Sequence, residues 1–486
     1  MASEDATSTN HLESGAVGLP HIVFQSVTMM SPGAAVAFSL AVGVLFAGPV
    51  LPLSVLLALI GCLLVAYALS QQAKHVPSAG SLFAYACKAY GRRGGFFVGW
   101  CVAIYILFFI PAVYLLFPVI VDQVFARDLG ISIGWAPWAI AGAVLVAAVA
   151  LRGVHFSSTV AMGLGALEVA VFVALSIWML TSSHAHLSGT PFLPSHSPTG
   201  FTGVFKGAVF GILAFTGFEA AAAFGEEGRE PRKSIPRALI VATIAVGLFY
   251  VFCSYGWVIG TGVDSFQKTV TSSTNPWVGL ASKYWGVGWV AIFLALINSV
   301  FAVTLSAVNS GTRILYSMGR AGMLPKPMAA VHKKYHTPSV AIIAASIWGL
   351  VVALLAGWKW GAGTGFGVVA TVLTIFAILA YISASVGVFT YYWRHRQGKF
   401  RVVRHGIVPF AGAAAFLVVL YYQFVPLPAA PIVYANWVSV GLFAVVAAFT
   451  VLGHSRTLPI TDDAHIGFED LDAVSGSVVE VPVSAQ

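Results

Sequence analysis

The chain has 486 residues, of which 58% are hydrophobic and only 9% are charged, and its mean hydropathy is +0.88. A soluble domain carries about 25% charged residues because most of its surface faces water, so this composition excludes a water-soluble globular protein. The formal net charge is +8, and the placement of the basic residues described below accounts for it without a nucleic acid partner.

Both ends of the chain are polar and acidic. The first 20 residues contain no lysine or arginine, whereas a cleaved signal peptide needs a basic start followed by an apolar stretch. We therefore expect residues 1–20 to form an uncleaved, disordered N-terminus. The acidic tail, residues 454–486, is also expected to be disordered.

Between these ends lie twelve apolar runs. A helix needs about 20 apolar residues to cross the hydrocarbon core of a bilayer, and each run approaches or exceeds that length. The predicted spans are 22–46, 50–73, 95–121, 134–151, 156–181, 204–225, 236–261, 287–312, 339–357, 364–392, 407–425 and 431–453. The sequence thus predicts an all-α protein of the plasma membrane with about twelve transmembrane helices.

The basic residues indicate the orientation of these spans. An even number of spans puts both termini on one side. If that side is the cytoplasm, all but five of the 25 lysines and arginines fall in cytoplasmic segments. The five exceptions are Arg127, Lys206, Lys268, Lys283 and Lys359. By the positive-inside rule we expect both termini to be cytoplasmic.

Few residues suit a metal or cofactor. Four cysteines are scattered without a CxxC spacing, which favours neither a disulfide framework nor a zinc site. His184, His186 and His196 lie in a loop rich in proline and serine with no nearby carboxylate, so we expect no metal and no cofactor. The chain also lacks a Gly-x-x-x-x-Gly-Lys-Ser/Thr loop, which argues against an ATP-driven pump.

Acidic residues are rare inside the spans, which makes each one informative. Glu168 in span five and Glu219 in span six lie deep in apolar sequence, and Asp122 lies at the end of span three. A charge at mid-bilayer costs about 2.5–3.5 kcal/mol on insertion scales, so such a residue is usually paired, protonated or functional. The alternative is a carboxyl group that only joins neighbouring helices by hydrogen bonds.

Two spans carry helix-breaking residues at similar depth. Span one contains Ser31-Pro32-Gly33, and the proline is expected to interrupt the helix near Ser31. Span six contains Gly217 followed by Glu219. A half-helix that starts at a break offers free N–H groups to a carboxylate, and one that ends there offers carbonyls to an ammonium group or cation. Breaks at corresponding positions of two halves indicate a transporter site.

Three sequence blocks then resemble a known family. They are AFTGFE at 214–219 with EEGREPRKSIPRA at 226–238, VPSAGS at 76–81 with Tyr85 and FVGW at 97–100, and 310–325 with Thr337-Pro338. In order and spacing they resemble the helix 6, helix 2–3 and helix 8–9 regions of amino acid permeases of the amino acid–polyamine–organocation superfamily. The resemblance covers roughly residues 20–455.

The resemblance implies a leucine-transporter-like fold. It comprises two inverted five-helix repeats, residues 21–181 and 204–392, followed by two further helices, 407–453, with helices 1 and 6 broken in mid-membrane. It also implies a substrate between the breaks, with its carboxylate at backbone N–H groups and its amine at backbone carbonyls. The carboxylate would face Ser31, Gly33, Ala34 and Ala35, and the amine would face Met30, Phe215 and Thr216. Gly217 forms part of the second break, and Leu213 or Phe218 corresponds to a gating aromatic residue of relatives.

Two departures from the family pattern bear on function. Many relatives have a glycine-rich run at the first break, where this chain has Ser31-Pro32-Gly33-Ala34-Ala35, so a substrate without a carboxylate stays open. Some relatives carry a lysine on helix five that substitutes for a sodium ion, and Glu168 falls at that position.

The favoured hypothesis is a secondary transporter, not an enzyme, that carries amino acids or related small amines by alternating access. Glu168 is the candidate proton-coupling residue of such a symporter, since a buried carboxyl group can exchange its proton near neutral pH, and Glu219 is expected to brace the break in helix six. The alternatives are a sodium-coupled carrier or exchanger using Thr304 or Ser306, and a polyamine importer using Glu219 or Glu168. A channel or a membrane-embedded enzyme is less favoured. Tyr105, Asn298 and Tyr381 are possible pocket-lining residues.

Overall fold

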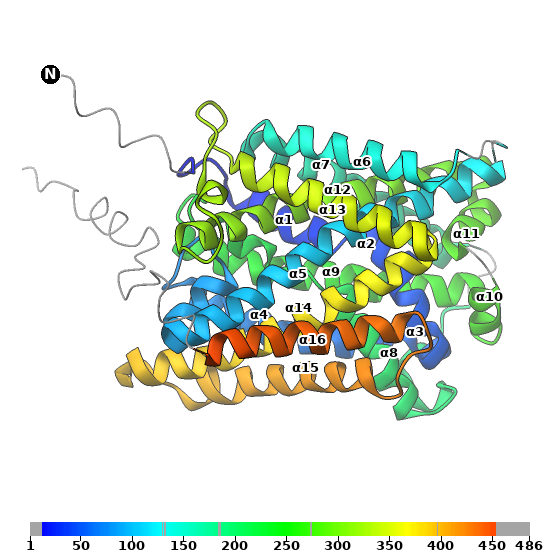
Figure 1. Ribbon diagram of the computed structural model, residues 1–486. Helices are drawn as coiled ribbons and strands as arrows, with labels where there is room; N and C mark the ends of the chain where they lie inside the picture. Colours follow the sequence, from blue (N-terminus) through cyan, green and yellow to red (C-terminus); the bar gives the residue numbers. More distant parts are fainter. Residues whose placement is uncertain are drawn as a thin grey trace, which may run out of the picture.

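The computed structural model describes residues 12–128, 130, 133–182, 186–272, 275–395 and 397–452. These residues form helices and connecting loops, and the described part contains no strand beyond one isolated bridge between Val17 and Gly228. The helices run side by side along one axis (Figure 1). The start of the described chain and the end of its last helix lie at the same end of the bundle, which we call the terminal side, and the opposite end is the far side.

The helices of the first half have the following bounds. They are α1 Leu19–Met29, α2 Pro32–Ala34, α3 Leu40–Ala47, α4 Leu51–Ala73, α5 Leu82–Asp128, α6 Trp135–Leu151 and α7 Val154–Thr181. In the second half they are α8 Phe201–Ala214, α9 Pro231–Thr261, α10 Phe266–Ser272, α11 Pro276–Trp285, α12 Trp289–Arg320, α13 Ser339–Trp360, α14 Ala362–His395, α15 Val408–Phe424 and α16 Ile432–Val451. Short π turns (η1 Ala35–Ser39, η9 Val402–Ile407) and 3₁₀ turns (η2 Gly48–Val50, η3 Thr190–Phe192, η4 Pro194–His196, η5 Phe218–Phe224, η6 Gly286–Gly288, η7 Lys326–Ala329, η8 Gln397–Lys399) complete the secondary structure.

The prediction of an all-α membrane protein is confirmed. Ten helical segments of the described chain are long and apolar enough to cross a membrane. The sequence underestimated one of them. Helix α5 spans 47 residues with a kink at Gly91, where φ is 72°, whereas the predicted span covered only 95–121.

The residues just before α1 are ordered, which differs from the expected disorder of residues 1–20. Val17 accepts a hydrogen bond from the Arg229 N–H (2.9 Å) and donates one to the Glu227 carbonyl (3.1 Å). Leu12 is buried against Ala79 and Tyr316. These contacts fix the start of α1 to the loop that precedes α9. The predicted tail at 454–486 lies outside the described residues.

A buried ion pair joins the same loop to α12. The Arg313 guanidinium donates to both carboxylate oxygens of Glu227, from Nε to Oε2 and from Nη2 to Oε1 (3.0 Å). Its Nη1 donates to the Asn309 carbonyl (2.5 Å), and its centre lies 4.6 Å from the Phe224 ring centroid. Both charged side chains are at most 1% exposed, so each charge compensates the other for its lost contacts with water.

We predict that Arg313→Gln lowers stability strongly, because Glu227 would then be a buried carboxylate without its counter-charge. Breaking a buried pair in this way costs about 3–5 kcal/mol. The measurement is thermal unfolding of the purified protein in detergent. The double variant Arg313→Met with Glu227→Leu should recover much of the loss, and a single variant as stable as the wild type would contradict the prediction.

Candidate functional site

The first predicted break is present. Helix α1 ends at Met29, Ser31 adopts a left-handed backbone with φ 49°, and the helix resumes at Pro32. Proline has no N–H to continue the hydrogen-bond ladder, and its ring clashes with the preceding turn. A left-handed serine is uncommon, so the surrounding contacts must hold it in place.

The second predicted break lies directly against the first. Helix α8 ends at Ala214, Gly217 has φ 108°, and the chain resumes as the 3₁₀ turn η5 at Phe218. A β-carbon at position 217 would lie 2.4 Å from Met29 Cγ and 3.0 Å from the Met29 carbonyl oxygen. Only glycine fits both this backbone angle and this contact.

Side-chain hydroxyls form hydrogen bonds with backbone groups that the breaks leave without helical partners. The Tyr250 hydroxyl, from α9, lies 2.7 Å from the Met30 carbonyl oxygen and 3.0 Å from that of Ala214, so it joins the two half-helices. The Ser26 hydroxyl, from α1, donates to the Phe218 carbonyl (2.6 Å) and accepts from the Ala221 N–H (3.0 Å). Both breaks are therefore fixed to each other by hydrogen bonds.

The N–H groups that the sequence offered to a substrate carboxylate are largely engaged in this conformation. The N–H of Ser31 donates to the Thr28 carbonyl (3.0 Å), and that of Ala35 to the Ser31 carbonyl (2.8 Å). The Ala34 N–H donates to the Ser299 hydroxyl of α12 (3.0 Å), which also lies 3.0 Å from the Ser31 hydroxyl. The Ser31 hydroxyl is therefore the polar group of this break that can turn toward a ligand.

Glu168 lies behind the first break. Its side chain, from α7, is fully buried, and neither carboxylate oxygen has a hydrogen-bond partner of standard geometry among the described residues. The Ser299 hydroxyl and the Gly33 N–H are the polar groups that approach it. Helix α2 is held close to α7, since a β-carbon on Gly33 would lie 2.8 Å from the Phe172 ring.

Glu219 occupies a hydrogen-bonded position beside the second break. The Tyr105 hydroxyl of α5 donates to Oε1 (2.9 Å), and the Tyr381 hydroxyl of α14 donates to Oε2 (2.5 Å). The same Tyr381 oxygen accepts from the Gly217 N–H (3.1 Å). This network connects α5 and α14 to the interrupted helix.

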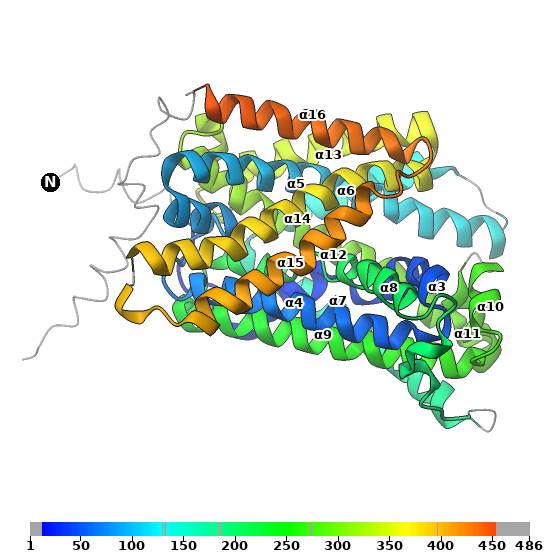
Figure 2. The same cartoon turned by 90° about the horizontal axis from the view of Figure 1, so that it is seen from below.

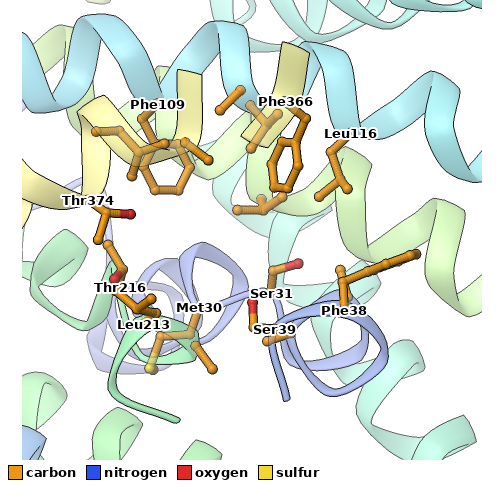
Figure 3. A pocket seen from close by; sticks show the side chains of 18 of the residues that line it. Met30, Ser31, Phe38, Ser39, Phe109, Leu116, Leu213, Thr216, Phe366 and Thr374 are labelled. Carbon is orange, nitrogen blue, oxygen red and sulfur yellow. The ribbon is translucent and has the colours of Figure 1, made fainter. Parts of the chain in front are cut away.

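A cavity of about 420 Å³ opens beside the two breaks and extends toward the far side. Met30 and Ser31 form one wall, and Phe109, Leu116 and Phe366 face them (Figure 3). The described residues that line it are Met29, Met30, Ser31, Ala34, Ala35, Phe38, Ser39, Val42, Phe109, Ala112, Val113, Leu116, Phe210, Leu213, Ala214, Thr216, Val303, Phe366, Ala370, Leu373 and Thr374. We call it the central cavity.

Six of the ten predicted substrate-binding residues line the central cavity. They are Met30, Ser31, Ala34, Ala35, Leu213 and Thr216. The other four, Gly33, Phe215, Gly217 and Phe218, lie behind it. Phe215 is fully buried against Tyr250, at 5.1 Å between ring centroids, and Phe218 against Tyr381, at 5.0 Å.

The other candidates of the sequence also lie away from this cavity. Tyr105 and Tyr381 hold Glu219, as described, and Asn298 donates to the Leu164 carbonyl (2.6 Å). Thr304 donates to the Val300 carbonyl of its own helix (2.6 Å), and Ser306 to the Gln25 carbonyl (2.7 Å). Asp122 has a buried oxygen without a partner among the described residues.

The lining from α5 and α14 was missed by sequence reasoning. It consists of Phe109, Ala112, Val113 and Leu116 on α5, and Phe366, Ala370, Leu373 and Thr374 on α14. These residues are common in any membrane helix, and the sequence holds no signal that separates a cavity-facing phenylalanine from one that faces lipid.

A second, small cavity of about 20 Å³ lies toward the terminal side. Its polar lining comes from Ser81, Tyr105, Glu219 and Ser310, and its volume suits about one water molecule. Met29 and Phe109 line both this cavity and the central one. Their side chains form the partition that closes the central cavity toward the terminal side.

The described residues contain no group of three or more His, Cys, Asp or Glu side chains that could hold a metal ion. Of the three loop histidines considered from the sequence, His186 and His196 are among the described residues and His184 lies outside them.

A family model described as amino acid permease matches residues 22–449. The branched-chain amino acid permease BcaP of Bacillus subtilis is 28% identical over 62% of this chain and 66% of its own length. The low-affinity putrescine importer PlaP of Escherichia coli is 28% identical over 72% of this chain and 75% of its own length. Cationic amino acid transporter 4 of Mus musculus is 26% identical over 64% of this chain and 50% of its own length.

We predict that Tyr250→Phe destabilises the site, because the Met30 and Ala214 carbonyls would lose the donor they share in a buried position. An unsatisfied buried polar group costs about 1–3 kcal/mol, which thermal unfolding in detergent measures. Tyr255→Phe on the same helix is the matched control, since its hydroxyl donates to the partly buried Ser188 carbonyl. Equal losses in both variants would show that the two breaks do not depend on Tyr250.

Proposed function

We propose that this chain, which belongs to the amino acid permease family, is a secondary transporter that carries neutral amino acids with apolar side chains. The family and the similar proteins are named as permeases, importers and transporters, so the chain is a multi-pass membrane transporter and not an enzyme. The observation that carries the substrate proposal is the central cavity, which adjoins both helix breaks and has no charged side chain among its described lining residues.

The lining of the central cavity supports a neutral substrate. Its polar side chains are four hydroxyls, those of Ser31, Ser39, Thr216 and Thr374, and the rest of the lining is apolar. A diamine or a cationic side chain would enter without a counter-charge, and an unpaired charge in apolar surroundings is costly. The two carboxylates of the polyamine hypothesis do not line this cavity. Glu168 is buried behind it, and Glu219 already accepts two tyrosine hydroxyls.

The charged ends of an amino acid would bind at the breaks. Its carboxylate would approach the Ser31 hydroxyl and the start of the half-helix at Pro32, where the helix dipole favours negative charge. The Ala34 N–H becomes available there if the carboxylate displaces the Ser299 hydroxyl. Its ammonium group would face the carbonyls of 29–30 and 215–216. The apolar side chain would then point toward Val113, Val303 and Leu373.

We further propose twelve membrane crossings in two inverted five-helix repeats followed by two helices. Of the ten apolar segments, Leu19–Ala73 has 55 residues, enough for two crossings at about 20 residues each. The 17-residue α6 supplies the twelfth crossing. With the terminal side in the cytoplasm, the positive-inside rule is satisfied, and the central cavity opens to the exterior.

Glu168 is the proposed proton carrier of this symporter. Protonation would neutralise a buried carboxylate that approaches the Gly33 N–H and the Ser299 hydroxyl. It would therefore remove a negative charge next to the backbone of the first break. The rival is sodium coupling through Thr304 or Ser306. These hydroxyls donate to backbone carbonyls in this conformation, so a sodium site there would require them to turn.

The substrate proposal predicts that leucine, isoleucine and valine compete for uptake and that putrescine and lysine do not. Purified protein in proteoliposomes should take up labelled leucine, and lysine should compete with it at least about tenfold more weakly than leucine itself. A tenfold difference in affinity corresponds to only about 1.4 kcal/mol of binding free energy. Val303→Asp would place a carboxylate in the cavity and should strengthen competition by lysine, whereas Val303→Asn should not. Strong competition by putrescine in the wild type would contradict the proposal.

The coupling proposal predicts that Glu168→Gln separates exchange from accumulation. The variant should still exchange internal for external leucine but should no longer concentrate it when a pH gradient is imposed on the vesicles. Asp122→Asn is the control and should keep both activities. Unchanged proton-driven accumulation in Glu168→Gln would exclude Glu168 from coupling, and accumulation driven by a sodium gradient alone would favour the rival.

A further inference from the structure

A second large cavity lies beside the central one and shares part of its wall. Its volume is about 450 Å³, and it is enclosed by the far-side parts of α3, α8, α14 and α15 and by the start of α16. Its described lining residues are Phe46, Lys206, Val209, Phe210, Leu213, Ala370, Thr371, Thr374, Tyr422, Gln423, Val425, Pro426, Pro428 and Ile432. We call it the lateral cavity.

Lys206 is the charged residue in that lining. Its side chain is half-buried, its Nζ lies 6.0 Å from the Phe46 ring centroid, and it forms no ion pair with any residue that the structure describes. It lies eight residues before the end of α8 at Ala214, which corresponds to about 12 Å along a helix. The lateral cavity thus combines one positive charge near the far side with an apolar interior that reaches toward mid-membrane.

The outer wall of the lateral cavity is formed by helices that face the membrane. Helices α15 and α16 lie on the outside of the bundle (Figures 1 and 2). Apolar side chains beside the cavity are strongly exposed, among them Phe205 (54%), Tyr421 (56%) and Leu427 (51%). In a membrane protein such surfaces contact lipid chains. We therefore expect a ligand of this cavity to enter from the bilayer.

We propose that the lateral cavity binds a phospholipid with an anionic headgroup. Its phosphate would pair with Lys206, and one acyl chain would lie along α15 against Val209 and Phe210. Hydroxyls of Thr371 and Tyr422 and the amide of Gln423 would contact the glycerol region. A zwitterionic amino acid fits less well, because the lateral cavity offers its ammonium group neither a carboxylate among the described lining residues nor, as proposed for the central cavity, the carbonyls of residues 29–30 and 215–216. This inference depends on membrane insertion and not on which substrate is carried.

Such a lipid would contact the wall of the central cavity. Phe210, Leu213, Ala370 and Thr374 line both cavities. Phe210 also stacks on Phe46, with ring centroids 5.4 Å apart. A bound acyl chain supports these side chains from one face while the substrate contacts the other, so the lipid should alter the affinity for substrate.

The test uses Lys206→Gln, with Lys268→Gln as the matched control. Lys268 is an exposed far-side lysine that does not line the lateral cavity, so both variants lose the same charge. After purification in detergent with added phosphatidylglycerol, retained lipid is counted by native mass spectrometry. Loss of one lysine contact should weaken retention about fivefold, as expected for about 1 kcal/mol. Lys268→Gln should retain lipid like the wild type.

A second variant and a second readout make the test independent of charge. Thr371→Trp fills the cavity while keeping Lys206, and it should also lose the lipid. In proteoliposomes of phosphatidylcholine, addition of phosphatidylglycerol should lower the KM for leucine in the wild type but not in Lys206→Gln. Equal retention in all variants would overturn the proposal, as would equal loss in Lys206→Gln and Lys268→Gln. Since retention is measured without transport, its failure is distinct from failure of the proposed function.

Discussion

The site depends on one constraint. Where α1 and α8 are interrupted, backbone polar groups are left without helical hydrogen-bond partners. In hydrocarbon each such group is costly unless protein, water or a ligand meets it. The hydroxyls of Tyr250 and Ser26 form hydrogen bonds with such groups and thereby link the two breaks. The hydroxyls of Ser299 and Tyr381 accept hydrogen bonds from the N–H groups of Ala34 and Gly217. Because these side chains come from α9, α1, α12 and α14, satisfying the breaks also fixes four helices around one cavity.

Charge is arranged around that cavity and not within it. Glu168 lies behind the first break and Glu219 beside the second, each out of direct reach of a substrate in the central cavity. In the proposed site, a substrate would interact with hydroxyls, backbone groups and apolar side chains. In the proposed mechanism, this arrangement also leaves Glu168 free to exchange a proton, since a carboxylate that pairs permanently with a substrate ammonium group could not do so.

The sequence predicted those features that depend on one residue. Pro32 predicted the first break because proline cannot continue a helix, and the isolation of Glu168 and Glu219 in apolar runs marked them as unusual. The sequence could not predict that Ser299 would occupy the Ala34 N–H, because that contact joins residues 265 positions apart. It could not distinguish the cavity-facing side chains of α5 and α14 either, since cavity and lipid select the same apolar residues. The first part of α5 was missed because Lys88, Arg92 and Arg93 lie there and delay the start of the apolar run.

The most direct test of the account is substrate protection of a cysteine at position 216, in the second break and on the wall of the central cavity. Thr216→Cys should react with a membrane-impermeant thiol reagent added from outside, and leucine should slow that reaction. Lys268→Cys, on the exposed far-side surface outside the central cavity, should react with the same reagent at a rate that leucine leaves unchanged. If leucine left the Thr216→Cys rate unchanged, or slowed both cysteines equally, the paired breaks would not be the substrate site.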